Sequence, residues 1–219
     1  MSNRTLNLVP RRAVWISLLA AVTTWLSACA TPLIPGLSLS FPETSPGFVS
    51  TKQLSEGVSI APSVDRRLDY IGRDVAKAGW LACKTDTLGE GALPRLVDER
   101  IAEAVTKAQI FATVRSIDPQ ATWTLAPEIQ VFCSQTRGFI GRRVAGLVAI
   151  KFTLRKGSAI AWEQTLERVV TDADPDYTGS FVTTLEQGMR RSMADSLRLV
   201  LRDALREVDQ VVQKPGRMG

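Results

Sequence analysis

The sequence predicts an α+β fold, in which an antiparallel sheet of about four strands is covered on one face by two main helices. First, apolar and polar residues alternate through much of residues 122–170, as they do in half-buried strands. Second, the connections within this stretch are short, which is typical of an antiparallel meander. Third, a long apolar stripe at helical spacing follows near the end of the chain, which is typical of a helix that packs on a sheet.

The first segment of the chain is typical of an export signal. Three arginines, at positions 4, 11 and 12, precede a largely apolar run from Ala13 to Cys29, which is the layout of a signal peptide. This run is diluted by serine and threonine and is shorter than the ~20 apolar residues that cross a bilayer core. We therefore expect residues 1–28 to be a signal peptide, with an uncleaved anchor and an ordinary secretory signal as the alternatives.

The end of this run, Leu26-Ser27-Ala28-Cys29, resembles the lipobox of bacterial lipoprotein precursors. The resemblance implies that Cys29 is acylated and becomes a lipidated N-terminus, which would attach the protein to a membrane. Ala30 follows the cysteine at the position where an aspartate often marks inner-membrane retention in enterobacterial lipoproteins. By this resemblance we expect the outer membrane, with the protein facing the periplasm.

Most of the apparent basicity belongs to the signal. The chain has 27 basic and 22 acidic residues, and removal of the three arginines in residues 1–28 leaves 24 basic residues against 22 acidic ones. Nucleic-acid binding needs a concentrated basic face, so we expect no nucleic-acid partner. The chain has no histidine, which excludes Ser-His-Asp and Cys-His catalysis and the usual zinc sites. We expect no metal and no cofactor.

Two cysteines remain once Cys29 is assigned to the lipid. Cys83 and Cys133 form an even pair in a compartment that favours oxidation, and we expect a disulfide between them. Closing a loop of about 50 residues would stabilise the fold by roughly 4 kcal/mol in the chain-entropy model. The alternative is two separately buried thiols.

The mature chain is expected to begin with a tether, residues 29–50. Its prolines at 32, 35, 42 and 46 favour an extended chain; the segment either lies on a partner or membrane surface or packs along its own domain. Residues 51–214 are predicted to form a single domain, and residues 215–219 a tail. Within the domain we predict a strand at 53–61, a helix at 64–79, and an apolar run at Trp80–Cys83 that is either a strand or the end of that helix.

A second helix is predicted from Pro94 to Gln109, because one apolar stripe runs along it and Pro94 suits a first turn. The stripe comprises Leu93, Val97, Ile101, Ala104, Val105 and Ala108. Ile110, Phe111 and Val114 then mark the start of packed structure. Three strands are predicted at 122–135, 143–155 and 159–170, with Trp123 and Trp162 in the sheet core, one sheet face covered and the other exposed to water.

A long terminal helix is predicted to cover the sheet. Ser180 can cap it, and Pro215-Gly216 ends it after about Val212. The opposite side of this helix mixes arginines with acids, which favours a solvated face with local ion pairs over a face that lies on a membrane. The apolar stripe comprises Phe181, Leu185, Met189, Met193, Leu197, Val200, Leu201, Ala204, Leu205, Val208 and Val211.

The order of these elements resembles a group of small periplasmic α+β lipoproteins. The resemblance covers about residues 95–212 and is carried by the apolar phrases Ile101–Val114, Ala121–Phe132 and Ile160–Trp162. The group includes the auxiliary lipoproteins of ABC-type transport, and its layout is similar to the lipopolysaccharide-assembly lipoprotein, the polysaccharide-export lipoproteins and the TolB amino-terminal domain. The resemblance implies a non-catalytic accessory subunit, with a protein partner, of a machine that handles lipid, lipopolysaccharide or polysaccharide.

One stretch is a candidate contact site for a partner or for anionic lipid. Arg137, Phe139, Ile140, Arg142 and Arg143 lie where two antiparallel strands are expected to turn, and arginine and aromatic residues contribute strongly to interfaces. The alternative is a bulged continuation of the strands with the apolar pair in the core.

The alternative function is a carboxylate-based enzyme that acts on envelope glycan. Its candidate acids are Asp172, Asp174 and Asp176, because glycoside hydrolysis needs two carboxyl groups at a defined separation. A loop that contains proline and aspartate is more simply explained as an exposed turn. We therefore expect no enzymatic activity.

Overall fold

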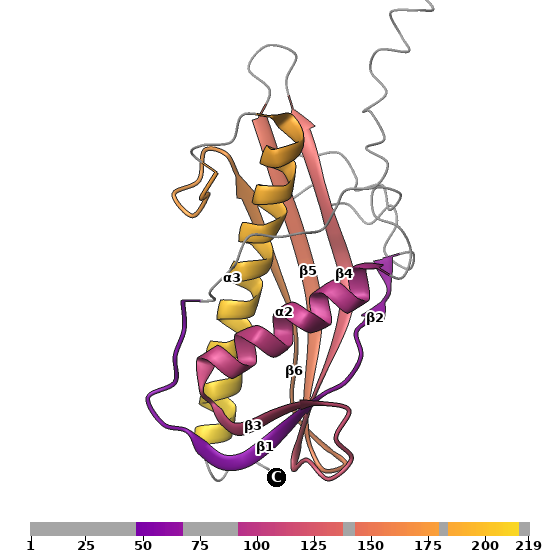
Figure 1. Cartoon of the computed structure of the whole chain (residues 1–219), viewed down its shortest axis with the longest axis vertical. Coiled ribbons are helices and arrows are strands. Elements are labelled where there is room, and N and C mark those ends of the chain that lie inside the picture. The colour runs from indigo at the N-terminus through magenta and orange to yellow at the C-terminus, as the bar shows by residue number, and fades with distance from the viewer. Residues whose placement is uncertain (1–46, 68–91, 138–142, 180–183, 215–219) are drawn as a thin grey trace, which may run out of the picture. The chain divides into compact units, whose positions relative to one another are not determined.

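The computed structural model describes residues 47–67, 92–137, 143–179 and 184–214, which all lie in one compact unit, residues 35–219. Six strands and two helices form this α+β body (Figure 1). In chain order they are β1 (Leu54–Ile60), β2 (Val64–Asp65), α2 (Ala92–Ala108), β3 (Phe111–Ser116), β4 (Trp123–Arg137), β5 (Arg143–Lys156), β6 (Ala159–Thr171) and α3 (Leu185–Gln213).

The strands form one mixed sheet in the order β3-β1-β4-β5-β6, with β2 beside β4. The predicted meander is confirmed, since β4 pairs antiparallel with β5 and β5 with β6. The prediction of a purely antiparallel sheet of about four strands is wrong, because β1 lies parallel to both β3 and β4, and β2 lies parallel to β4. The connection from β1 to β3 contains α2, and a connection of that length returns the chain in the same direction.

The predicted early strand at 53–61 is confirmed as β1, and the predicted helix at 94–109 is confirmed as α2. Gln109 ends α2 in the left-handed region, with φ of 54°, and β3 follows in the stretch predicted to begin packed structure. The predicted helix at 64–79 is wrong at its start, where Val64 and Asp65 pair with β4 as β2. Its remainder from residue 68, and the predicted run at 80–83, lie outside the described residues.

The long terminal helix is confirmed, but its start differs from the prediction. Thr184 has extended backbone angles and caps α3, its side chain accepting a hydrogen bond of 3.2 Å from the amide of Gln187. Residue 184 therefore precedes the helix instead of lying inside it, and the predicted cap, Ser180, lies outside the described residues. The helix ends at Gln213, one residue beyond the predicted end.

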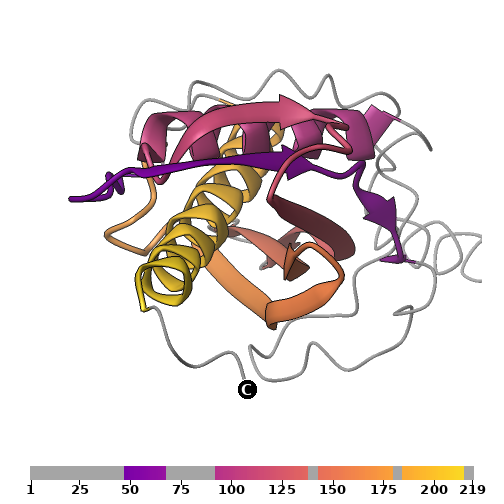
Figure 2. The same cartoon turned by 90° about the horizontal axis from the view of Figure 1, so that it is seen from below.

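The core lies between α3 and the sheet. α3 packs along β4, β5 and β6, while α2 packs against β1, β2 and β3 and also contacts α3; Figure 2 shows α3 lying on the concave side of the bent sheet. The prediction of one covered and one exposed face is wrong for the first half of β5, where every residue from Val144 to Ile150 is buried. β5 is the central strand of the meander, and its outward-facing Leu147 lies between Cys133 on β4 and Val169 on β6.

The helix approaches the sheet most closely at Gly146. A Cβ atom on this residue would lie 2.2 Å from the carbonyl carbon of Ser192, so only glycine fits between the strand and the helix backbone. At the same place the hydroxyl of Ser196 accepts a hydrogen bond from the amide of Val170 (3.1 Å) and donates one to the carbonyl of Gly146 (2.8 Å). A helix side chain thus bridges the backbones of β5 and β6.

We predict that Gly146→Ala destabilises the body by at least about 3 kcal/mol, because the added methyl group overlaps backbone atoms that cannot move without displacing α3. Urea unfolding of the purified protein measures this change. Gly157→Ala is the matched control, since nothing lies within 4 Å of its Cβ position and only its φ of +57° opposes the change, which costs about 1 kcal/mol. Equal destabilisation of the two variants would contradict the prediction.

Candidate functional site

The residues of the predicted contact site lie at the connection between β4 and β5. Arg137 ends β4, Arg143 begins β5, and the two are partners in the antiparallel register, so the predicted turn between antiparallel strands is confirmed. Arg143 is exposed. Phe139, Ile140 and Arg142 lie outside the described residues, so the contact role of this stretch stays a prediction.

The predicted lipid and disulfide residues are described only in part. Cys133 is 3% exposed on β4, and it forms a disulfide bond. Its partner is outside the described residues, as are Cys83 and Cys29. Pairing with Cys83 and lipidation of Cys29 therefore stay predictions.

The segment that joins the predicted tether to the domain is bound to the last turns of both helices. The Ser50 amide donates to the carbonyl of Ala108 at 2.7 Å, and its hydroxyl donates to Asp209 at 2.7 Å. Gln213 donates to the Ser50 hydroxyl and to the carbonyl of Lys52 at 3.0 and 2.9 Å. Residues 50–52 are thus fixed beside the C-terminal end of α3.

The β4–β5 connection lies at the opposite end of α3. Gly188, in the first turn of the helix, lies beside Val144, the second residue of β5, because a Cβ atom on Gly188 would lie 3.4 Å from the Val144 methyl groups. About 25 residues of helix separate Gly188 from the Ser50 contact, a distance of about 37 Å at 1.5 Å per residue. Ser50 and the strand ends that flank the predicted contact stretch therefore lie at opposite ends of α3.

Between these ends, a buried aspartate fixes the loop before α3. Asp195 is 0% exposed and accepts hydrogen bonds from the amide and hydroxyl of Thr178 at 2.9 and 3.0 Å. Arg191 and Arg198 form ion pairs with it at 3.6 and 3.5 Å. Local ion pairs on α3 are therefore confirmed, but the prediction that this face is simply solvated is wrong at Asp195, because the loop covers it.

The same loop carries the three acids of the enzyme alternative. Asp172, Asp174 and Asp176 are all exposed, and Asp174 accepts hydrogen bonds from the amide and hydroxyl of Thr171 (2.6 and 2.9 Å), which closes the turn after β6. Burial raises the pKa of the neighbouring Tyr177, with a further contribution from the charges of Asp172 and Asp195 and an opposing one from Arg191. These contacts support a turn, and the enzyme alternative stays untested.

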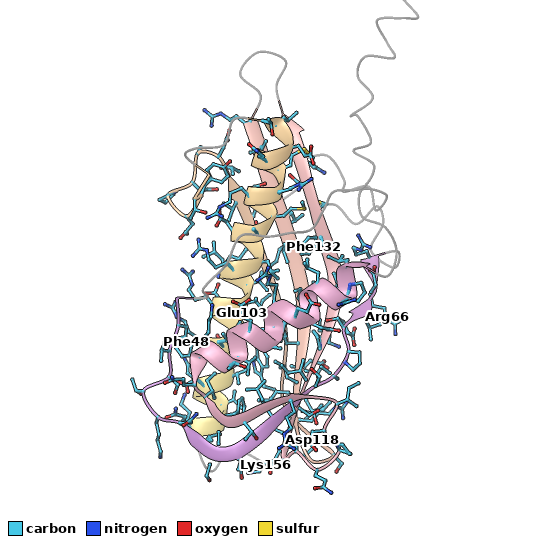
Figure 3. The ribbon with its side chains drawn as sticks, in the orientation of Figure 1. Phe48, Arg66, Glu103, Asp118, Phe132 and Lys156 are labelled. Atoms are coloured by element: carbon cyan, nitrogen blue, oxygen red, sulfur yellow. The ribbon has the colours of Figure 1, made fainter. Side chains whose placement is uncertain are left out.

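Two further clusters lie on the sheet. Trp123 is 2% exposed, which confirms its predicted place in the core; its indole donates to Glu56, and the Lys156 ammonium lies 5.0 Å from its ring centroid. In Figure 3, Lys156 and Asp118 lie at the same end of the body. Trp162 is half-buried, with its ring stacked 6.4 Å from that of Phe152, so it is only partly in the core.

Glu163 on β6 makes two contacts with β5. It pairs with Lys151 at 3.1 Å and accepts a hydrogen bond from Thr153 at 3.0 Å. The hydrogen bond from Lys151, then that from Thr153, lower the pKa of the Glu163 carboxyl below its ordinary value. These contacts fasten β6 to β5 on the face away from α3.

Within residues 47–67, 92–137, 143–179 and 184–214, no three His, Cys, Asp or Glu side chains are grouped so as to hold a metal ion. In the same part of the chain, neither helix is both long and apolar enough to cross a membrane.

The fold is shared with solved structures of low sequence identity. No protein-family model and no curated protein matches the chain. Protein XCC0632 from Xanthomonas campestris, assigned to the family model DUF330, is similar with a TM-score of 0.57 at 13% identity, over 79% of this chain and 95% of that one. At this identity the similarity shows the α+β fold alone.

Two more distant structures are the PelC dodecamer from Paraburkholderia phytofirmans and a minor lipoprotein from Acinetobacter baumannii. PelC has a TM-score of 0.41 at 13% identity, over 71% of this chain and 92% of PelC. The minor lipoprotein has a TM-score of 0.32 at 13% identity, over 73% of this chain and 91% of that chain.

We predict that Asp195→Asn destabilises the protein by about 2–4 kcal/mol, because it leaves two arginines without their buried counter-charge. Hydrogen exchange at residues 171–179 should accelerate, since the loop loses its charged acceptor. Urea unfolding and amide hydrogen exchange measure both effects. Asp176→Asn is the matched control, because only its backbone carbonyl is used, by Arg198; unchanged exchange in the Asp195 variant would contradict the prediction.

Proposed function

We propose that this chain is a lipid-anchored accessory subunit of an envelope transport or assembly machine, held at the outer membrane on its periplasmic side. The observation that carries the proposal is the lipobox-like Leu26–Cys29 after a signal-type leader. Its role is to bind and to tether, and not to catalyse a reaction. The material that the machine handles is lipid, lipopolysaccharide or polysaccharide.

The arrangement of the body supports this proposal. The described chain is held at Ser50, beside the end of α3, and Arg137 and Arg143, the strand ends that flank the predicted contact stretch, lie at the other end of that helix, about 37 Å away. The intervening residues 30–49 can extend to about 60 Å at 3.1 Å per residue. A lipid-anchored domain with this layout can present its far end to a protein partner while it remains attached to the membrane.

We predict that Cys29→Ser releases the protein from the membrane, because the acyl chains are lost and each buried methylene contributes about 0.8 kcal/mol to membrane binding. Fractionation of cell envelopes and mass spectrometry of the mature N-terminus measure this change. Ala30→Asp is the matched variant, and it should keep the lipid but shift the protein to the inner membrane in an enterobacterial host. A Cys29→Ser protein that still co-sediments with the outer membrane would contradict the anchor.

We predict that reversing the charges of Arg142 and Arg143 to Glu weakens partner capture at least severalfold, because arginines contribute strongly to interfaces. Chemical crosslinking in intact cells, followed by purification of the lipoprotein, measures this loss. Arg206→Glu is the control, since it changes the charge of an exposed residue on α3, near the other end of the body. Unchanged crosslinks in the double variant, with its unfolding midpoint intact, would exclude this stretch as the contact.

A further inference from the structure

β6 forms one edge of the sheet and is the longer of the two edge strands. It has 13 residues and pairs on one side with β5, whereas β3 at the other edge has six. An edge strand presents a row of unpaired backbone amides and carbonyls, which favours pairing with another strand. Figure 1 shows β6 alongside β5, away from β4.

The register shows which backbone groups of β6 point outward. The amide of Asp172 donates to the carbonyl of Val144, and hydrogen-bonded pairs recur every second residue in an antiparallel ladder. Hence Val170, Arg168, Leu166 and Gln164 face β5, while Val169, Glu167, Thr165 and Glu163 face outward. The amide of Thr171, which also faces outward, is capped by Asp174, in agreement with this alternation.

Among the contacts of the described residues, the outward edge of β6 is closed only near its C-terminal end. Besides the Thr171 cap, Arg168 donates to the carbonyl of Glu167 at 3.0 Å. In the described part of the chain, no hydrogen bond engages the outward amides of Glu163, Thr165, Glu167 and Val169 or the carbonyls of Glu163, Thr165 and Val169. The side chains of Glu163, Thr165 and Glu167 are exposed and that of Val169 is half-buried, so a second strand can approach.

We propose that β6 pairs antiparallel with β6 of a second copy of this chain, about a two-fold axis at Leu166, so that two sheets become one continuous sheet. In this register Thr165 lies opposite Glu167 of the partner strand, and Glu163 lies opposite Val169. These are the positions whose amides and carbonyls face outward, and pairing them makes about eight hydrogen bonds between the copies, two of them to the Glu167 carbonyls that also accept from Arg168. The outward amides of each β6 strand donate to the outward carbonyls of the other, so that the same surface is used on both copies, as in an isologous two-fold interface.

The side chains favour this register over its neighbours. Leu166 lies opposite itself at the axis, and Arg168 lies opposite the exposed amide side chain of Gln164. A shift of the axis by one residue places Glu163 opposite Glu167, or Glu167 opposite itself, and like charges directly opposite each other are destabilising. A shift of two residues either places Arg168 opposite itself or moves the pairing into the irregularity beside Leu154 and Arg155.

The opposing explanation of these side chains is that they protect the edge. Natural proteins place charged residues on edge strands to prevent pairing, and Glu163, Glu167 and Arg168 would serve that purpose. The two explanations predict different oligomeric states and different crosslinks, so the same experiment distinguishes them.

The experiment is site-specific disulfide crosslinking of the full-length protein in cell envelopes. Residues opposite each other in a pair without hydrogen bonds have Cα atoms about 4.5 Å apart, which suits a disulfide. Leu166→Cys should therefore give a dimer on a non-reducing gel after mild oxidation, in at least severalfold greater yield than Gln164→Cys, which lies two residues from the axis. Equal yields at the two positions, or no dimer with Leu166→Cys, would overturn the proposal.

Thr165→Pro tests the backbone pairing itself. Its amide faces outward, so proline removes an intermolecular donor without removing a β5–β6 hydrogen bond, and proline is tolerated at such edge positions. Added to Leu166→Cys, it should abolish the crosslink, whereas Thr165→Val should retain it. A crosslink that persists with proline would overturn the proposal.

A pair of surface variants keeps the test decisive if the proline variant does not fold. Gln164→Glu places an acid opposite Arg168 of the partner strand and should raise the Leu166→Cys crosslink severalfold, while Gln164→Arg places like charges opposite each other and should lower it. Gln164 is exposed, so both variants should fold. The same crosslink yield in both would overturn the proposed register.

Discussion

The packing of α3 on β5 is the interaction on which the rest of the body depends. Gly146 lets the helix backbone approach the strand, and at this point Ser196 joins the backbones of β5 and β6. Ser192 extends the contact to β4, because its hydroxyl lies 3.4 Å from that of Ser134. Buried hydroxyl groups are costly unless they are hydrogen-bonded, so these pairings hold the helix in one position along the sheet.

The position of α3 decides where the two ends of the body lie. Its first turn lies beside Val144, near the β4–β5 connection, since a Cβ atom on Gly188 would lie 3.4 Å from that side chain, and its last turns hold Ser50. Asp195, midway along it, fixes the loop that follows β6. One helix therefore sets the separation between Ser50 and the start of β5 at Arg143, although it contains neither of them.

The sequence predicts the local features of this fold well and the non-local ones poorly. β4, β5, β6 and α2 were predictable because alternation and helical periodicity are properties of neighbouring residues. The mixed sheet was not, since the parallel pairing of β1 with β3 and β4 depends on a crossover through α2. β2 was not predictable either, because this strand has only two residues and its partners on β4, Glu128 and Ile129, are distant in the sequence.

The candidate site shows the same division. The lipobox-like stretch and the β4–β5 turn are local signals, and both were available from the sequence. The role of Asp195 was missed because its loop partner, Thr178, lies outside α3. A glycine within a strand often marks a close approach of another backbone, and Gly146, read together with the small residues Ser192 and Ser196, could have indicated the closest contact of helix and sheet.

The hydrogen bonds of Ser50 have a mechanical consequence. A pull on the chain from its N-terminal side is resisted at Ser50, whose hydrogen bonds join it to the ends of α2 and α3. Behind them, β1 lies between two parallel neighbours, so a pull along the strand loads both ladders in shear, and many hydrogen bonds share the force. A load that enters the body at Ser50 is thus spread over both helices and the middle of the sheet.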